Sequence, residues 1–564
     1  MVAEKRPSRV RTGTTNAVRR VPKAAANTLV QESSPINVTL VLRRRAPLPS
    51  VESLGKRLPA KRRHLSAQEV ASRFGALPED LDRLRTLVAT EPDVQLSHVN
   101  LPGSAVQLVG PAPALGRIRK KLGNRVRGGF GLDALSSDSP SSPPTSEGSP
   151  PRPRSVRPIM LFDLQHGRRF TAPEVARLYE FPPYDGEGQC IGLIELGGGF
   201  LSQDMVVYFK DLGIPLPRIT CVGDNHRSLI PFANVEVTMD VQIVGAICPK
   251  ANIVVYNSQD VSIQGYFNAL SMALTDEENR PSVLSVSWSF PEIEGLGPTP
   301  EEAHLVEELL TIAALMGITV CSSNGDQGGS IPLVPPYAMP DPNGYTTGFL
   351  SPAASFAASS PLVLACGGTS LENVKGRRIL NEIVWNRLSE RLNFTAGFMN
   401  GPYSMATGGG ISHLFGIPRY QRLADVPPAV SRSWDNFKLS PPRLFPGRGT
   451  PDVAANSDLN TGYRFYYQGQ WNVGGGTSAA APMWAALILL INQGLSQRNG
   501  REIRTGWLNP LLYHLRLARK QDVVRTITQG NNGAYSAHPD AAWNACTGLG
   551  SPRGMNLARA LGAL

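Results

Sequence analysis

Near-continuous runs of apolar, β-forming residues recur along the last two-thirds of the chain. Five runs stand out: Cys190–Leu196, Asn252–Ser258, Val283–Ser289, Ile318–Ser323 and Leu362–Gly367. Runs of this kind are typical of strands that a sheet buries on both faces. Helix-forming stretches lie between several of them, including Gly265–Leu274 and Glu301–Met316. The alternation predicts an α/β domain with a mostly parallel sheet and helices on both of its faces.

The N-terminal quarter has a different pattern, in which shorter strand and helix signals alternate. Residues 36–45 predict a strand, and residues 92–98 and 105–110 predict two paired strands. The segments that begin at Leu65 and Pro78 have the start signals of capped helices. We therefore expect a small α+β unit ahead of the α/β domain.

Serine, proline and arginine dominate the stretch Ser136–Pro158, which predicts an exposed linker between the two parts. The chain has 564 residues, too many for one ordinary domain, and its net charge of +11 is divided unevenly. Through residue 157 there are 27 Lys and Arg against 12 Asp and Glu, whereas the remainder is slightly acidic. No zinc, helix-turn-helix or RNA-binding motif accompanies the basic part, so we expect no nucleic-acid partner.

Candidate chemistry begins with the small-residue stretch Gly475–Pro482, which presents one serine hydroxyl, that of Ser478. The apolar run Met483–Ile491 follows at once and predicts a buried helix. A tight glycine turn that leads into a helix can expose a nucleophilic oxygen at the helix N-terminus. Many Gly-Thr-Ser triplets are plain turns or helix caps, so this motif needs support from a base.

The usual base, histidine, does not accompany this serine in any catalytic motif of the subtilisin kind. The eight histidines are His64, His98, His166, His226, His304, His413, His514 and His538. Instead, Glu236 and Asp240 are spaced by four residues, which places both on one face of a helix that the apolar run after Asp240 marks as buried. Two buried acids close together share a proton and titrate as a pair. The commoner alternative is a solvated Glu/Asp pair.

A third acid, Asp326, follows the predicted strand Ile318–Ser323 in a glycine-rich turn. The carboxyl ends of parallel strands are where α/β sheets place their sites. The alternative for Asp326 is a structural Asp-Gly turn.

Taken together, these segments make the chain resemble the sedolisin family of serine-carboxyl peptidases, and within it the kumamolisin-like enzymes. The resemblance runs from about residue 170 to the C-terminus. The matching pieces, in family order, are Cys190–Gly199, Glu236–Asp240, Ser285–Trp288, Ser323–Asp326, Thr407–Ser412, Pro451–Ala454, Gly475–Ser478 and Cys546–Pro552.

The resemblance implies a subtilisin-like, doubly wound fold in which a glutamate takes the place of the catalytic histidine. It makes Ser478 the nucleophile and Glu236 the general base, with Asp240 behind Glu236 to orient it. Asp326 would take the place of the oxyanion-hole asparagine of subtilisins. By the same resemblance, two further residues extend the hydrogen-bond network behind this pair: Glu195 and Trp288.

A carboxyl base and a carboxyl oxyanion donor both predict activity in acid. An unperturbed carboxyl has a pKa of about 4, so it can accept and return a proton only near that pH unless burial raises its pKa. Asp326 can stabilise an oxyanion only while it carries a proton. We expect an acidic optimum and loss of activity towards neutral pH.

The N-terminal part then corresponds to the propeptide that sedolisins carry, which inhibits the enzyme and assists its folding. We divide the chain into a disordered basic N-terminus (1–34), an inhibitory, ferredoxin-like α+β prodomain (35–134), a linker with the activation cleavage (135–165) and the peptidase domain (166–564). A basic prodomain on an acidic enzyme is held partly by charge, which acid weakens. We expect acid-triggered release and self-cleavage in the linker.

Three functions fit the resemblance. The first is an acid endopeptidase, the second a tripeptidyl exopeptidase on the same scaffold, and the third a catalytically silent peptidase-like binding protein. All the residues needed for catalysis are present, which argues against the third. Substrate preference depends on loops such as the proline-rich insert Gly328–Leu350, which we expect to shape the cleft.

The family's structural Ca²⁺ site is where this chain departs from the pattern. Two of its usual ligands are aspartates, but the matching positions here are Thr526, ahead of Ile527, and Asn544. Because Ca²⁺ prefers several anionic oxygens, we expect the site to be weakened or lost. We expect nearby Asp540 to compensate in part, or Arg525 to supply a charge in place of the ion.

The remaining features place the protein only broadly. The six scattered cysteines predict buried free thiols rather than a disulfide scaffold. No apolar run predicts a transmembrane helix, and the basic N-terminus lacks the apolar core of a signal peptide, although the family is mostly extracellular or lysosomal. We expect a secreted monomer that acts on proteins or peptides, with its own prodomain as inhibitor and no membrane partner.

Overall fold

The computed structural model describes most of the chain, with gaps. The described residues are 35–135, 169–223, 231–292, 297–332, 350–352, 354–388, 392–393, 402–403, 405–431, 434–435, 438–439 and 443–564. The predicted disordered segment 1–34, nearly all of the predicted linker 135–165 and most of the proline-rich insert lie outside the described residues. The predicted domain boundaries therefore stay predictions.

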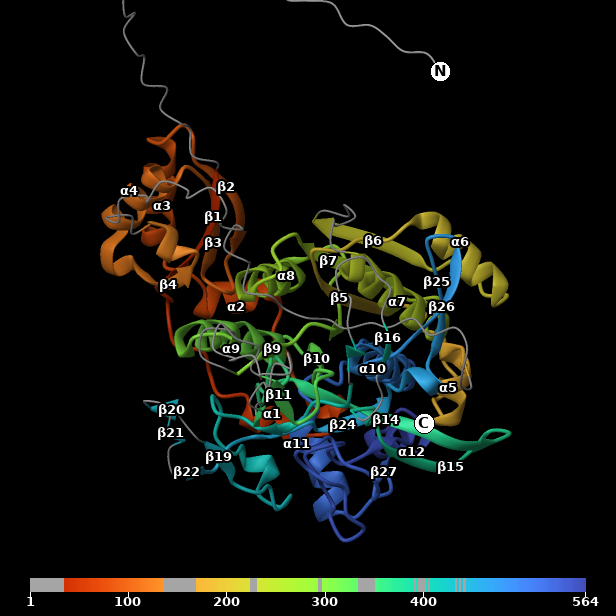
Figure 1. The fold of residues 1–564 in the computed structure, drawn as a ribbon. Helices are drawn as coiled ribbons and strands as arrows, with labels where there is room; N and C mark the ends of the chain where they lie inside the picture. Colours follow the sequence, from red (N-terminus) through yellow and green to blue (C-terminus); the bar gives the residue numbers. More distant parts are fainter. Residues whose placement is uncertain are drawn as a thin grey trace, which may run out of the picture.

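The central element of the molecule is an eight-stranded sheet (Figure 1). Its order is β15-β14-β10-β8-β5-β7-β6, and β24 pairs with β14 beside this path. All neighbours are parallel except β14 and β15, a hairpin at one edge. The strands are β5 (Cys190–Leu196), β6 (Arg218–Gly223), β7 (Asn252–Ser258), β8 (Val283–Val286), β10 (Thr319–Ser323), β14 (Leu364–Lys375), β15 (Arg378–Val384) and β24 (Val453–Asn456). The predicted mostly parallel, doubly wound sheet is confirmed.

Alternation along the strands sends side chains into two separate cores, one on each face of the sheet. In β5, Ile191 and Leu193 join one core, and Ile194 and Leu196 join the other. Because both faces are apolar, both need a cover of helices. The first face is covered by α5 (Ala172–Leu178), α6 (Ser202–Asp211), α7 (Pro231–Ile247), α10 (Thr477–Asn499) and α12 (Gly554–Leu561), and the second by α8 (Ile263–Thr275) and α9 (Pro300–Leu315).

Helix α10 forms the centre of the first core. It is the one helix of the described residues that is long and apolar enough to cross a membrane by length and composition, and its apolar part is entirely buried inside the domain. A helix that is apolar all round is expected at the core of a large domain. Its buried position in the protein explains its composition.

The N-terminal unit is a four-stranded antiparallel sheet with the order β2-β3-β1-β4. With α2 as an additional helix ahead of α3, the elements follow the β-α-β-β-α-β order of the ferredoxin-like arrangement we expected. The prediction missed α4 and β4. The elements are β1 (Ile36–Leu42), α2 (Ala67–Phe74), α3 (Pro78–Ala89), β2 (Gln95–Asn100), β3 (Ala105–Gly110), α4 (Ala112–Leu122) and β4 (Val126–Phe130).

One face of this small sheet packs on its own helices α3 and α4, and the other packs on α8 and α9 of the large domain (Figure 1). The Phe130 and Phe267 rings lie 4.8 Å apart between their centroids. The Thr39 hydroxyl donates a hydrogen bond of 3.0 Å to the Asn268 side chain, and both residues are buried. The N-terminal unit thus shares a core with the α/β domain.

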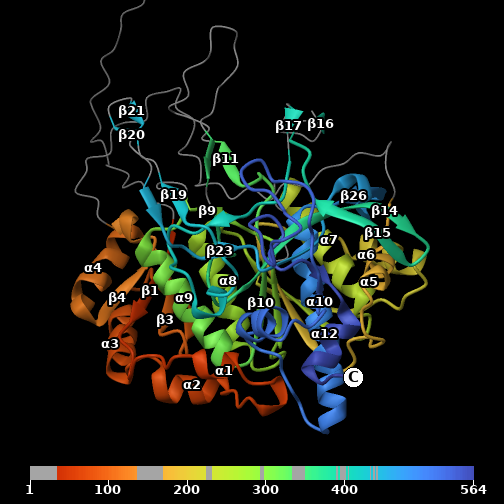
Figure 2. The ribbon, with the colours of Figure 1, turned by 90° about the horizontal axis from the view of Figure 1, so that it is seen from below.

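A second connection, which the sequence did not predict, is residues 43–66, which we call the strap. The strap includes the short helix α1 (Glu52–Gly55), and Figure 2 shows α1 and α2 along the lower edge of the molecule. Arg62 in the strap is buried and donates hydrogen bonds to the backbone carbonyls of Thr505 (2.5 Å) and Trp507 (2.8 Å). The Leu65 amide donates to the Leu315 carbonyl at the end of α9, at 2.8 Å.

Candidate active site

Ser478 lies in the first turn of α10, directly after strand β26 (Gln470–Gly474) and a glycine turn. Gly476 has a φ of +80°, a conformation that favours glycine, and it allows the chain to reverse into the helix. Ser478 is 3% exposed, and its hydroxyl donates to the Ser287 carbonyl at 3.4 Å. The predicted glycine turn into a helix is therefore present, but the hydroxyl that it presents is buried.

Glu236 and Asp240 lie one turn apart on α7, as their spacing predicted, and both are fully buried. Helix α7 packs against α5, α6, α10 and the sheet, so no side of it is left for water to solvate the two acids. The alternative of a solvated pair is therefore wrong. Neither oxygen of Glu236 has a hydrogen-bond partner among the described residues.

Ser287, which the sequence analysis did not single out, connects the acids to the serine. It follows the end of β8, and its hydroxyl lies 2.5 Å from Asp240 Oδ2 and 3.2 Å from the Ser478 carbonyl. The shorter contact is a hydrogen bond donated to the carboxylate. Ser287 lies inside the matched motif Ser285–Trp288, so the motif carried the signal without showing which member makes the contact.

Glu195 and Trp288 meet behind this pair. Glu195 is near the carboxyl end of β5 and is buried, and Trp288 Nε1 donates to Glu195 Oε2 at 2.9 Å. The other oxygen of Glu195 has no hydrogen-bond partner within the described parts of the chain. Burial raises the pKa of Glu195, and the charge of Asp240 adds to the shift, so the two carboxyls lie within electrostatic reach of one another.

Asp326 follows the carboxyl end of β10 and is buried against the start of α10. Its Oδ1 accepts hydrogen bonds from the Thr477 amide (2.8 Å) and the Thr477 hydroxyl (2.7 Å). Its Oδ2 lies against Gly476, where a Cβ would collide with it. A purely structural Asp-Gly turn, the alternative for Asp326, does not explain why both of its oxygens contact the start of the helix that carries Ser478.

Burial is the largest cause of the pKa shifts in this cluster, because it penalises the charged carboxylate. It raises the pKa of Glu236 well above its ordinary value, and repulsion from Asp240 and then Glu195 adds to the shift. Burial raises the pKa of Asp240 to about 8, against the Ser287 hydrogen bond. It raises the pKa of Asp326 to about 6, against the Thr477 hydrogen bonds. The cluster therefore holds protons to unusually high pH.

The residues expected at the calcium site lie apart from this cluster. Asn544 Nδ2 donates to the Ile527 carbonyl at 3.3 Å, and the Thr526 hydroxyl accepts a hydrogen bond from Arg516. Among the described residues, no group of three or more His, Cys, Asp and Glu side chains is arranged to hold a metal ion. All six cysteines are free, and Cys190 and Cys221 are only partly buried.

The chain is similar to known proteins over most of its length. The profile described as "Subtilase family" (Peptidase_S8) matches residues 223–509. The chain is 32% identical to kumamolisin of Bacillus sp. (strain MN-32), over 97% of this chain and 95% of that protein. It is 25% identical to tripeptidyl-peptidase sed5 of Aspergillus fumigatus, over 70% of this chain and 66% of that protein.

The fold is also that of a solved structure, Pseudomonas sedolisin (serine-carboxyl proteinase) complexed with two molecules of pseudo-iodotyrostatin. The TM-score is 0.55 at 23% sequence identity, and the match covers 70% of this chain and 98% of that one. These matches show that the chain belongs to the sedolisin family of serine-carboxyl peptidases, in its kumamolisin-like branch, and is a serine-type peptidase.

Proposed function

We propose that this chain is an acid-active endopeptidase that forms an acyl-enzyme on Ser478. The observation that carries the proposal is the environment of Glu236. It is a fully buried carboxyl with no hydrogen-bond partner among the described residues, near enough to Ser478 for that hydroxyl to lower its pKa. The oxygens of a structural carboxyl are engaged by donors of the fold, whereas both oxygens of Glu236 are open to accept a proton from the serine.

The reaction follows from these positions. The reacting molecules are those in which Glu236 is ionised, a minority in acid because burial raises its pKa. In them Ser478 Oγ turns from the Ser287 carbonyl to Glu236, gives its proton to the carboxylate and attacks the peptide carbonyl carbon. The tetrahedral intermediate collapses, Glu236 returns the proton to the departing amine, and the acyl group stays on Ser478. Water then attacks the ester, again with Glu236 as base, and releases the acid product.

Asp240 and Glu195 act behind Glu236. Asp240 Oδ2 is held by Ser287, while its other oxygen has no partner in the described structure and is free to orient Glu236. Negative charge on either neighbour raises the proton affinity of Glu236, and the three carboxyls titrate as a group.

Asp326 supplies the proton donor for the oxyanion. With Oδ1 occupied by two Thr477 donors, Oδ2 is the oxygen that carries the proton. Its pKa is raised by burial to about 6, so the donor is present below that pH and is lost as pH rises through it. An ionised Asp326 would repel the developing oxyanion. Activity is therefore expected to fall above about pH 6.

The test is hydrolysis of an internally quenched peptide with a blocked N-terminus between pH 2.5 and 8, after incubation in acid. We expect cleavage only in acid, and none by Ser478→Ala or Glu236→Ala. A rate at pH 8 equal to that in acid would contradict the mechanism.

The tripeptidyl alternative is supported by relatives that bear that name, among them the Aspergillus fumigatus protein. The same assay decides it, because an exopeptidase needs a free N-terminus. Cleavage of free but not blocked peptides would favour the exopeptidase, and no cleavage of either would favour a silent homologue.

The N-terminal unit is proposed as the inhibitor, and its main ion-pair contact is Glu308 on α9. Glu308 accepts two hydrogen bonds from Arg44 (2.8 and 3.0 Å) and two from Arg127 (2.8 and 2.9 Å). Burial alone would raise the Glu308 pKa, but the two guanidiniums lower it below its ordinary value. A lowered pKa means that the ion pairs stabilise docking at neutral pH, and this stabilisation is lost as pH falls through that lowered value.

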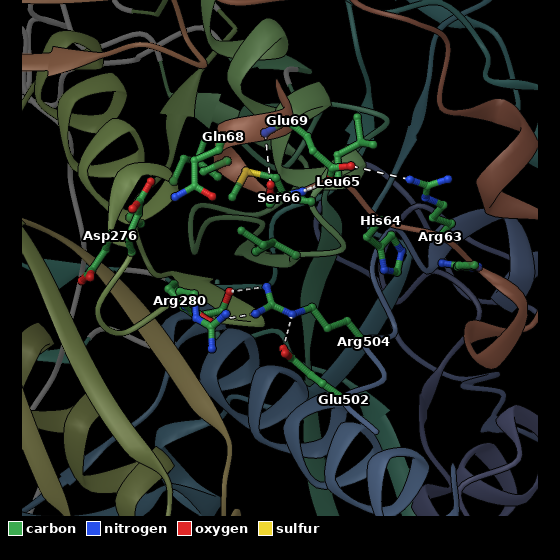
Figure 3. Close-up of a pocket in the computed structure, with 18 of the residues that line it drawn as sticks. Arg63, His64, Leu65, Ser66, Gln68, Glu69, Asp276, Arg280, Glu502 and Arg504 are labelled. Carbon is green, nitrogen blue, oxygen red and sulfur yellow. Dashed lines mark hydrogen bonds and ion pairs between the residues drawn. The ribbon is translucent and has the colours of Figure 1, made fainter. Parts of the chain in front are cut away.

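His64 adds a second acid-sensitive contact in the strap (Figure 3). Its ring is buried against Gly317 and Gly506 at the edge of a cavity of about 780 Å³. Burial, reinforced by the charges of Arg62 and Arg504 and opposed by that of Glu502, lowers its pKa to about 4. Released from the pocket, His64 would titrate near its usual value of about 6.5. Docking therefore weakens as pH falls from about 6.5 to 4, because only the released ring takes up a proton.

These contacts are tested on the Ser478→Ala zymogen, with the linker nicked by an added protease at neutral pH. Gel filtration from pH 7 to 3 should show release of the N-terminal unit in acid, and Glu308→Gln should move release to higher pH. The matched control is Glu301→Gln, an exposed change on the same helix. A fragment that stays bound at pH 3, or a Glu308→Gln profile equal to the control, would contradict the proposal.

A further inference from the structure

The part of the chain that corresponds to the family's calcium site is already internally hydrogen-bonded. Asn544 stands where the resemblance places an aspartate ligand. Its Oδ1 accepts from the amides of Cys546 (3.0 Å) and Thr547 (2.9 Å) and lies 3.1 Å from the Thr547 hydroxyl. Its Nδ2 donates to the Ile527 carbonyl at 3.3 Å. Both ends of the amide are therefore committed within the protein.

The donated hydrogen bond is what distinguishes asparagine from aspartate here. A carboxylate has no hydrogen to donate to the Ile527 carbonyl. An aspartate oxygen at position 544 would therefore approach the Ile527 carbonyl oxygen with a cation between them. The Asn544 amide joins the same two segments directly. The bridge that an ion would make is present without one.

The other aspartate position, Thr526, is occupied by a hydroxyl that faces a cation of the protein itself. Arg516, in the π-helical turn His514–Ala518, donates through Nη2 to Thr526 Oγ1 at 2.6 Å. A fixed guanidinium beside neutral ligands repels Ca²⁺. Carboxylate ligands would have to overcome that repulsion, and the two expected positions supply none.

Arg525, the residue we expected to supply a charge in place of the ion, contacts other groups in this structure. It donates to the Ile379 carbonyl at 3.2 Å and lies 3.6 Å from the buried carboxylate of Glu382. Asp540, the acid expected to compensate, is exposed. The donor set of the described residues therefore does not fit a calcium ion.

We propose that Arg516 and Asn544 together replace the structural calcium, so that this chain folds and keeps its C-terminal loops without the metal. The replacement matters for the active site. The Cys546 carbonyl, two residues after Asn544, lies 3.3 Å from the Thr407 hydroxyl. The neighbouring Ala406 amide donates to the Asp326 carbonyl at 3.1 Å. The network thus supports the loop that carries the oxyanion donor.

The first experiment uses the full chain with Ser478→Ala, which prevents self-digestion. Its melting temperature is measured with EDTA and with calcium chloride from 0.01 to about 10 mM, and calcium binding is measured by calorimetry. We expect no shift and no binding. A site occupied at 100 times its Kd would raise the melting temperature by several degrees, so such a rise would overturn the proposal.

The second experiment separates the two residues from general stability. Arg516→Met should lower the melting temperature by about 2 °C or more. The matched control is Arg519→Met, which removes the exposed arginine directly after the π-helical turn, whose Nε lies 3.3 Å from His514 Nε2. Equal losses in the two variants would contradict the role of Arg516.

The third experiment restores the metal site. The triple change Arg516→Met, Thr526→Asp and Asn544→Asp removes the cation and returns both carboxylates. We expect a protein that binds calcium in calorimetry and melts several degrees higher with calcium than with EDTA. A triple variant that folds but does not bind calcium would show that these three positions do not decide whether the site takes the metal. That result would overturn the proposal.

Discussion

Two buried glutamates in this molecule have opposite surroundings. Glu382, on β15, accepts hydrogen bonds from the hydroxyls of Tyr179, Thr369 and Ser551, each at 2.7 Å, and lies 3.6 Å from Arg525. Glu236, on α7, is equally removed from water but has no hydrogen-bond partner among the described residues. One carboxyl has its acceptor sites engaged, and the other has all of them open.

The difference appears in their pKa values. Burial raises both, but hydrogen bonds from three hydroxyls and the charge of Arg525 oppose the shift at Glu382. At Glu236 three neighbouring carboxyls, those of Asp240, Glu195 and Asp326, reinforce it, and the Ser478 hydroxyl opposes it. An unsatisfied buried group costs stability, so it persists where it performs a function. Glu382 is thus satisfied by groups of the fold, whereas Glu236 keeps the open oxygens that the proposed proton transfer needs.

The largest expected effect is on activity, and it comes from removing Glu236 or Ser478. Glu236→Ala and Ser478→Ala should each lower kcat by about 10⁴-fold or more, because the base and the nucleophile act as one unit. Neither change should lower the melting temperature, since Glu236 satisfies no donor. Initial rates at the acid optimum and calorimetric melting of the same samples check this. A Glu236→Ala protein that keeps a tenth of the activity would sink the assignment.

The next largest effect is on stability, and it comes from removing Glu382. Glu382→Ala leaves three buried hydroxyls and Arg525 without their acceptor and should cost about 3–5 kcal/mol in the free energy of unfolding. Activity per folded molecule should stay within about threefold, because neither Glu382 nor its hydrogen-bond partners take part in the proposed reaction. Urea unfolding and active-site titration measure the two quantities. A stable but inactive protein would reverse the comparison.

A third prediction concerns pH and Asp326. Asp326→Asn keeps a donor at Oδ2's position at every pH, whereas the aspartate loses its proton as pH rises through about 6. The variant should be slower in acid by about 10-fold but should hold its oxyanion donor above pH 6. We therefore expect the high-pH decline of kcat/KM to move upward. An unchanged profile would mean that another group sets it.

A fourth prediction concerns stability and pH. The folded-state pKa of Asp240 is raised from an ordinary value near 3.8 to about 8. A raised carboxyl pKa means that stability is fully present in acid and is lost as pH rises through the raised value. In a Ser478→Ala background, Asp240→Asn should flatten the loss of stability between pH 4 and 8. Equal slopes with and without Asp240 would contradict the shift.

The smallest expected effect comes from Ser287, which holds Asp240 next to Glu236. Ser287→Ala removes the hydrogen bond to Asp240 and should lower kcat by about 10-fold while leaving KM nearly unchanged. It should also move the pH profile, since that hydrogen bond opposes the raised pKa of Asp240. The matched control is Ser285→Ala, a buried serine in β8 whose hydroxyl has no partner within the described chain. Two variants that behave alike would make Ser287 merely structural.

Much of the site could be predicted because its signals are local. The four-residue spacing of Glu236 and Asp240 places them on one face of any helix, and the turn before Ser478 determines where its oxygen points. Strand β7 was predicted to the residue because an unbroken apolar run has clear ends. By contrast, β6 was missed because its residues are only partly buried and show no such run.

The contacts that were missed join residues distant in the sequence. Arg62 bonds to a carbonyl 443 residues away, and Ser287 reaches Asp240 across 47 residues. The arginine that contacts Thr526 is Arg516, ten residues back in the chain, because the π-helical turn directs it there. No spacing rule connects such pairs.

The sequence by itself determined the α/β alternation and the pairing of Glu236 and Asp240 on one helix, and it nominated Ser478 as the nucleophile of the proposed mechanism. All of these depend on periodicity or on residue identity at one place in the chain. Only the tertiary structure decided which buried carboxyl is satisfied and which is left open, and which arginine faces Thr526. Hydrogen-bond satisfaction depends on the direction and distance of groups from separate elements, and only packing sets those.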